Sequence, residues 1–291
     1  MGDMGRCPIS PEKRKFQMAR KRIAKAKFDF TENLLPSNRK EVFVDCLKIK
    51  KAVMVKIGFR LLLCSLPLLL SYLLMNISIS SMYDQYLLGN VEIEVIRSTV
   101  NAFNLINILL WGIVGIGCAG SFRVVRMMIW QEPIFINNDF SDGIKLNWKP
   151  FSAIFSLIGF VIFAVMAVDI QAELQYLLIF ISAILLLPVL IIMMGLYNVY
   201  NITPSEAVYN SLTIYIKGLF YNFLMAIGVS VIFALLIASG VLRFIIIPLF
   251  ILLIAPVMMV AIHLYLCYLF DININKVSYP EYVDRGIHRR K

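Results

Sequence analysis

Long uninterrupted apolar segments dominate this 291-residue chain and decide what it can fold into. A bilayer core about 30 Å thick is crossed by roughly 20 apolar residues of α-helix. Six segments reach that length, and they are residues 57–80, 101–122, 151–168, 174–200, 218–240 and 244–270. Because 60% of the residues are hydrophobic and only 16% are charged, a soluble globular domain is excluded. The sequence therefore predicts an all-α polytopic membrane protein with six transmembrane helices.

The basic residues lie almost entirely on one side of the predicted spans. Of the 28 Lys and Arg residues, all but Arg97 and Arg243 fall on the side of the two termini. Basic residues collect in the cytoplasmic loops of membrane proteins and set their orientation. We therefore expect both termini in the cytoplasm. The same asymmetry explains the net charge of +10 without nucleic acid as a partner, and it favours contact with anionic lipid.

This topology divides the chain into three regions. They are a basic cytoplasmic N-terminal helix (1–35), a six-span membrane domain (36–272) and a basic cytoplasmic tail (273–291). Apolar residues recur every three or four positions from Phe16 to Phe30 among many Lys and Arg residues. Such a stripe is typical of a helix on the membrane surface. The alternative is a helix that docks a cytosolic partner.

A short polar and apolar segment precedes the first, third and fifth predicted spans. These segments are 41–48, 142–149 and 206–213, and each follows turn or helix-capping residues. We expect each to form an amphipathic elbow helix at the cytoplasmic face, which suggests a threefold repeat of elbow plus helical hairpin. Elbows of this kind anchor a span at the interface, and similar helices in ABC permeases dock an ATPase. Residues 81–100, between the first two spans, are expected to form a small amphipathic cap.

Three glycines in the second span, Gly115, Gly117 and Gly120, match the string GxGxxG. A nucleotide site would need a strand before the string and an acidic residue about 20 positions after it. Here the string lies inside an apolar span, and Gly112 extends it. We interpret these glycines as a face of small residues that allows close helix packing.

Few polar residues lie inside the predicted spans. Asn101, Asn104 and Asn107 share one face of the second span, and His263 is the only histidine in a span. Amides are costly against lipid, so this face should point into the bundle. There the amides either hydrogen-bond between helices or line a path for a polar substrate. His263 is either a buried core residue or part of a proton relay.

No pattern for catalysis is visible in the sequence. The chain has no nucleophile elbow, no HExxH motif and no P-loop, and its five cysteines have no metal-binding spacing. We therefore expect a protein that is not an enzyme and that holds no metal or cofactor.

The densest polar stretch on the cytoplasmic side covers residues 123–149. It supplies the candidates for contact with a partner or a lipid, namely Arg123, Arg126, Asp139, Lys145, Asn147 and Lys149. The two arginines extend the second span to the level of phosphate headgroups. Anchoring by charge and docking of a partner are both open interpretations of this stretch.

The same stretch carries a family resemblance. The run from Gly117 to Arg126, then Asn138-Asp139-Phe140 and Gly143-Ile-Lys145-Leu-Asn147, resembles the YesL-like family of bacterial integral membrane proteins of unknown function. Ser65-Leu66-Pro67 is similar to the family's Leu-Pro step, and residues 205–210 fit its second cytoplasmic elbow. The resemblance covers roughly residues 40–235 and implies a bacterial inner membrane location. Family members are often encoded beside carbohydrate ABC transporters, which implies an accessory role in sugar uptake.

Two functional hypotheses follow. The first is a non-enzymatic accessory protein or component of an ABC-type carbohydrate transport system, with ABC transporter subunits as partners. The second is a stand-alone transporter, permease or lipid-handling protein that uses the asparagine face of the second span. Both hypotheses allow a homo-oligomer.

Overall fold

The computed structural model describes residues 36–168, 172–238 and 242–288, and every regular element in these ranges is helical. In chain order the elements are α2 (Arg39–Ile49), α3 (Lys51–Leu87), α4 (Ile93–Ile129), α5 (Ile136–Ala167), α6 (Ala172–Val199), α7 (Pro204–Lys217), α8 (Leu219–Ala238), α9 (Arg243–Leu249), η3 (Phe250–Ile254), α10 (Ala255–Phe270), η4 (Asp271–Asn275), α11 (Lys276–Ser278) and η5 (Pro280–Tyr282). The predicted N-terminal helix, residues 1–35, lies outside the described residues.

Five helical runs in the described part of the chain are long and apolar enough to cross a membrane. They are α3, α4, α5, most of α6, and the run 244–278 that contains α10. A sixth span is present if α7 and α8, which meet at an angle of 99°, count as one broken span. The all-helical architecture fits the multi-pass membrane protein that the sequence predicts.

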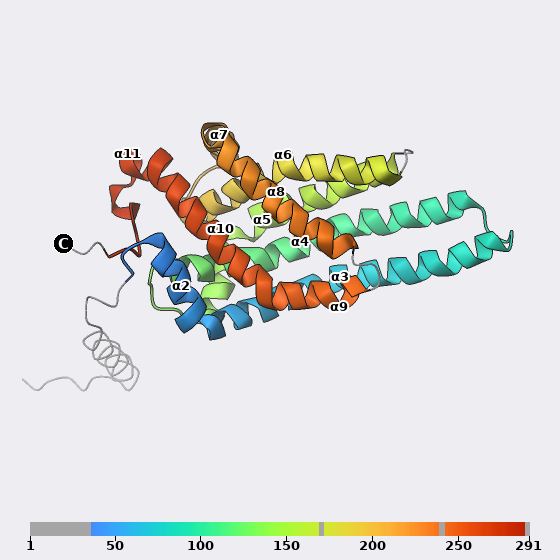
Figure 1. Cartoon of the computed structure of the whole chain (residues 1–291), viewed down its shortest axis with the longest axis horizontal. Helices are drawn as coiled ribbons and strands as arrows, with labels where there is room; N and C mark the ends of the chain where they lie inside the picture. Colours follow the sequence, from blue (N-terminus) through green and yellow to red (C-terminus); the bar gives the residue numbers. More distant parts are fainter. Residues whose placement is uncertain (1–35, 169–171, 239–241, 289–291) are drawn as a thin grey trace, which may run out of the picture.

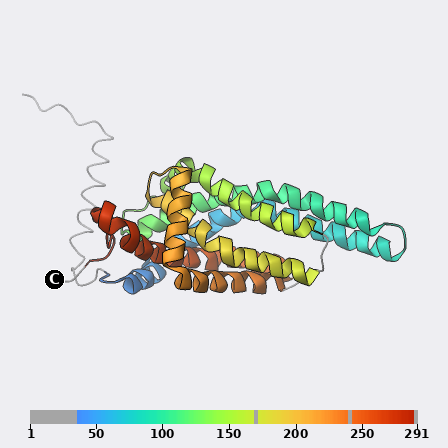
Figure 2. The same ribbon diagram turned by 90° about the horizontal axis from the view of Figure 1, so that it is seen from above.

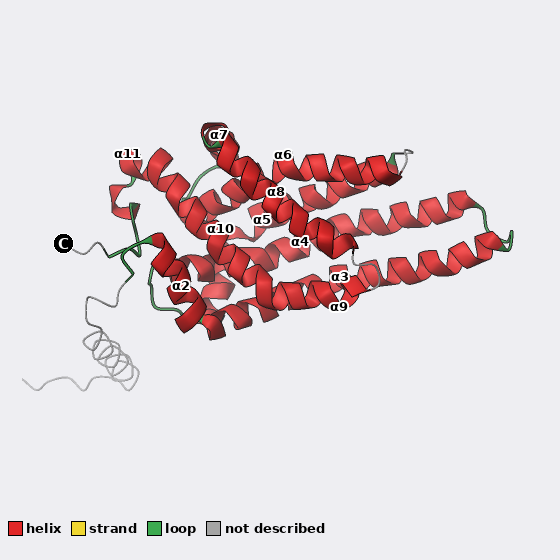
Figure 3. Ribbon diagram, in the orientation of Figure 1, coloured by secondary structure: helices red, strands yellow, loops and turns green. Residues whose placement is uncertain are grey.

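The helices form an elongated bundle with two different ends (Figures 1, 2 and 3). One end, named the terminal end here, carries α2, α7, the loop 130–135 and the C-terminal residues. The opposite end, named the far end, carries the hairpin tips, and the tip between α3 and α4 reaches beyond the others (Figure 1).

The α3–α4 hairpin is longer than a membrane requires. Each helix has 37 residues and is therefore about 55 Å long at 1.5 Å per residue, against about 30 Å for the bilayer core. The amphipathic cap predicted for residues 81–100 is wrong. Both helices continue through that stretch and only residues 88–92 connect them, because the segment lacks a helix-breaking residue before Gly89.

Two of the three predicted elbows are separate short helices. Asn38 caps α2, since its side chain accepts a hydrogen bond from the backbone N–H of Glu41. Thr203 and Glu206 form a reciprocal capping box at the start of α7. The third segment, 142–149, differs from the prediction because it lies within α5, which continues through it into the span.

Helix α4 packs closely against α3 and α5 through glycines. A Cβ atom at Gly115 would lie 2.5 Å from the carbonyl oxygen of Phe151 on α5. A Cβ atom at Gly117 would lie 2.7 Å from the Cβ of Cys64 on α3. On the partner helix, a Cβ atom at Gly143 would lie 2.9 Å from the carbonyl oxygen of Ala119. The packing interpretation of the GxGxxG string is therefore confirmed.

The last helical run, from α9 to α11, contains two π-helical turns. The first, η3, lies between Pro248 and Pro256, each of which removes a backbone hydrogen-bond donor. It packs against α3 at Gly58, whose missing side chain lets the backbone of Leu252 approach. The second, η4, lies at the terminal end. Isolated π-turns inside α-helices often mark functional positions.

We predict that Gly115→Ala lowers the free energy of unfolding by about 1–3 kcal/mol, because the added methyl group forces α4 and α5 apart. Gly228→Ala is the matched control, since a Cβ atom there has no neighbour within 4 Å. Thermal unfolding of both variants in the same detergent measures the difference. Equal unfolding temperatures would show that the glycine contact does not hold the two helices.

Candidate functional site

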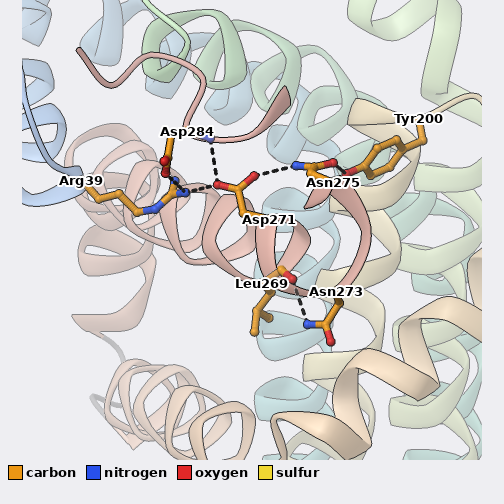
Figure 4. Close-up of polar contacts among 7 residues, drawn as sticks. All are labelled: Arg39, Tyr200, Leu269, Asp271, Asn273, Asn275 and Asp284. Carbon is orange, nitrogen blue, oxygen red and sulfur yellow. Dashed lines mark hydrogen bonds and ion pairs between the residues drawn. The ribbon is translucent and has the colours of Figure 1, made fainter. Parts of the chain in front are cut away.

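A network of five polar side chains joins four segments of the terminal end (Figure 4). Arg39, in the first turn of α2, donates a hydrogen bond to Asp271 of η4 and lies 3.7 Å from Asp284. The other oxygen of Asp271 accepts from the amide of Asn275 at 2.7 Å. The oxygen of that amide accepts a hydrogen bond from the hydroxyl of Tyr200, which follows α6. We name these five residues the terminal network.

The terminal network contains two buried polar side chains, which require hydrogen-bond or charged partners. Asp271 and Asn275 are 6% and 4% exposed. A buried carboxylate is costly unless it is paired with a cation and hydrogen-bonded, and Arg39 and Asn275 supply both kinds of contact to Asp271. Burial also raises the pKa of Tyr200 above its ordinary value, so the phenol stays protonated and donates. The network therefore fixes α2 and η4 at one position relative to each other.

The C-terminal residues 279–288 fold back over the same end. Arg285 forms an ion pair with Glu132 at 2.8 Å, and its guanidinium lies 4.3 Å from the ring centre of Trp130. Gly286 has a φ of +84° and packs against the last turn of α4, where a side chain would not fit. The described part of the predicted cytoplasmic tail is thus bound to the membrane domain.

Lys50 ties the α2–α3 junction to the end of α4. Its ammonium group donates to the carbonyl of Met128 at 2.6 Å and to the side chain of Gln131 at 3.2 Å. The carbonyls in the last turn of a helix have no intrahelical partner and attract a cation. Burial lowers the pKa of Lys50. On the same elbow, burial raises the pKa of Cys46 to about 11, so its thiol is not reactive near neutral pH.

Two of the six predicted contact residues make hydrogen bonds within the protein. Arg126 donates to the carbonyl of Asn198 at the end of α6, and its guanidinium lies 4.9 Å from the ring centre of Trp130. Asp139 is buried and accepts a hydrogen bond from the backbone N–H of Phe135 at 2.5 Å, which caps the start of α5. Asp139 therefore offers no free surface for a partner, whereas Arg126 is half-buried and its Nε atom has no hydrogen-bond partner among the described residues.

The other four contact candidates are placed differently. Lys145 and Lys149 are exposed, and Lys145 lies 3.5 Å from Asp142 one turn earlier. The amide of Asn147 lies 3.2 Å from the carbonyl of Tyr197 on α6. Arg123 is half-buried, and its Nε atom has no hydrogen-bond partner in the described part of the protein. The structure therefore does not gather the six residues into one surface.

The predicted asparagine face lies partly within the α3–α4 interface. Asn104 and Asn107 are buried, and Ser71 of α3 donates to the side-chain oxygen of Asn107 at 2.6 Å. The amide nitrogen of Asn107 and the side-chain oxygen of Asn101 are buried without a partner among the described residues. This face thus contains both an inter-helix hydrogen bond and unpaired polar atoms.

His263 does not belong to the asparagine face. It is fully buried in α10, where its ring meets the ring of Phe122 edge-on at 6.0 Å. Phe122 lies fifteen residues after Asn107 on α4, which is about 22 Å along the helix axis. All four polar residues lie in predicted spans, but the structure separates the histidine from the asparagines.

The terminal network was not predicted from the sequence. Arg39 and Asp271 are 232 residues apart, and no local pattern links them. One signal was present, since Asp271, Asn273 and Asn275 directly follow a long apolar segment. Polar residues at every second position are unusual at the end of a transmembrane helix, and they mark η4.

No protein-family model matches the chain, and no curated protein or solved structure is detectably similar to it. The function proposed below therefore rests on the sequence pattern and on the geometry of the terminal end.

We predict that Arg39→Gln loosens the C-terminal residues from the bundle, because it removes the cation paired with two carboxylates. A hydrogen bond to a charged group contributes about 1.5–3 kcal/mol, so the local opening that gives a protease access to the backbone at Arg285 should become more frequent by a factor of about ten or more. The rate of trypsin cleavage after Arg285, followed by intact mass spectrometry, measures this opening. Lys40→Gln, at the exposed neighbouring position, is the control, and equal cleavage rates for the two variants would contradict the role of the network.

Proposed function

We propose that this chain is a non-enzymatic integral membrane protein of the bacterial inner membrane, accessory to or part of an ABC-type carbohydrate transport system. In this proposal the terminal end faces the cytoplasm and is the docking face for an ABC transporter subunit. The distribution of the 28 basic residues supports the orientation. The resemblance to the YesL-like family supports an ABC transporter subunit as the partner.

The geometry of α7 supports this proposal. This helix lies across the bundle axis at the terminal end (Figure 2) and meets α8 at 99°. Its capping box is complete, and the hydrogen bonds from Thr203 hold the pKa of Glu206 below its ordinary value. A helix that is capped at a fixed angle presents the same side chains to every partner.

The outer face of α7 is apolar. Ala207, Ser211 and Ile214 are buried against the bundle, whereas Tyr209 and Ile216 are 72% and 68% exposed. Large exposed apolar side chains on one helix face suit insertion into a hydrophobic groove of a partner. The membrane interface is the other environment that would cover them, and binding of a partner distinguishes the two.

Purification from native membranes in a mild detergent, followed by mass spectrometry, tests the proposal. We expect an ABC ATPase or a sugar-permease subunit to co-purify with the wild-type chain. The variant Tyr209→Ser/Ile216→Ser should lower the yield of that subunit at least fivefold, because it removes the apolar contact but leaves the charge unchanged. Charge reversal in Lys145→Glu/Lys149→Glu should also lower it.

The matched control is Tyr83→Ser/Leu87→Ser, which removes the same kinds of exposed side chain from the far end. It should leave the yield of the subunit unchanged. Recovery of no ABC subunit after cross-linking, or a yield that none of the variants changes, would refute the docking role.

One observation favours the alternative, a stand-alone permease or lipid-handling protein. Buried polar atoms without a partner among the described residues recur along α4, on Asn101 and Asn107. Such atoms are costly in a bilayer unless water or a substrate satisfies them. Transport by the purified chain alone in proteoliposomes, abolished by Asn107→Leu, would decide for this alternative.

A further inference from the structure

Buried polar atoms without a hydrogen-bond partner gather in one layer of the bundle near the terminal end. In the described part of the chain nine such side-chain atoms occur, and five of them belong to four residues of this layer. The four residues are Arg123 and Arg126 of α4, Asn198 of α6 and His263 of α10. We name them the arginine layer.

Two of the four side chains contact Phe122. The amide of Asn198 donates to the carbonyl of Phe122 at 3.0 Å, and the ring of His263 meets the phenyl ring edge-on. Arg126 donates to the carbonyl of Asn198 and acts electrostatically on both Arg123 and His263. Three helices that are distant in sequence thus bring polar groups to one place.

The layer carries two positive charges, and the one carboxylate that attracts Arg126 is shared with another cation. Neither Arg123 nor Arg126 forms an ion pair with any residue that the structure describes. Glu132, which attracts Arg126, is ion-paired with Arg285 at 2.8 Å. An arginine does not lose its proton in a protein, and an unpaired charge away from water is costly. The expected counter-charge is therefore an anion from outside the chain.

We propose that the arginine layer binds a phosphate-bearing anion, supplied either by a lipid headgroup or by free phosphate. Guanidinium groups hold phosphate oxygens through paired N–H donors. His263 and Asn198 are 0% and 3% exposed, so the donors that reach an anion at the surface come from the two arginines. Because both arginines are half-buried, they can reach an anion at the surface of the bundle. This site is independent of the docking function proposed above.

Thermal unfolding of the detergent-purified full chain tests the site with inorganic phosphate as the probe. Potassium phosphate should raise the unfolding temperature by about 3 °C or more relative to potassium chloride at equal ionic strength. Arg123→Gln/Arg126→Gln should lose this shift. Lys145→Gln/Lys149→Gln removes the same charge from exposed positions at the same end, and it should keep the shift.

A second probe separates the two sources of the anion. The same proteins are unfolded in nanodiscs of phosphatidylcholine with and without one-tenth phosphatidic acid. A shift with inorganic phosphate indicates a free anion as ligand, and a shift with phosphatidic acid alone indicates a headgroup. Both results support the site if the arginine variant loses the shift and the lysine variant keeps it.

Two results would overturn the site. One is the absence of a shift with either probe, and the other is an equal loss of the shift in the arginine and lysine variants. If the double arginine variant does not purify as a folded protein, Arg123→Gln alone decides, because the Nε atom of Arg123 has no hydrogen-bond partner among the described residues. That single variant should lose at least half of the shift, and an unchanged shift would equally overturn the site.

Discussion

In a bilayer, helices gain nothing from hiding apolar surface against one another, because lipid tails are equally apolar. Close packing and polar contacts between helices have to hold the bundle instead. The glycines of α4 meet this requirement, since Gly115 brings α4 to the backbone of α5 and Gly117 brings it to α3. Helix α10 packs on α4 at Phe122 through His263, whereas α7 and α8 pack mainly against α6.

The terminal end is held by a different interaction, the pairing of charges. Arg39 links α2 to Asp271, and Arg285 links the C-terminal residues to Glu132. These pairs connect parts of the chain that are far apart in sequence. The unpaired arginines of α4 are a separate feature of the same end.

Local composition in the sequence predicted the helices, but it did not predict contacts between residues that are far apart in the chain. The length of the apolar segments predicted the helical membrane architecture, and helix-capping residues predicted α2 and α7. The segment 142–149 was assigned to a separate helix, but Asp139 caps α5 earlier and the helix runs through it. The length of α3 and α4 beyond the bilayer was missed because polar residues of the tip resemble a loop. The terminal network and the arginine layer depend on contacts between helices, which no spacing within one segment reveals.

We propose that the terminal end faces the cytoplasm, and cysteine labelling can test this orientation. Leu88→Cys at the far end and Tyr209→Cys on α7 replace side chains that are 75% and 72% exposed. Both variants carry Cys7→Ser and are treated in spheroplasts with a maleimide that does not cross membranes. With the terminal end in the cytoplasm, Leu88→Cys is labelled in intact spheroplasts and Tyr209→Cys only after lysis. Labelling of Tyr209→Cys before lysis, with Leu88→Cys protected, would contradict this orientation.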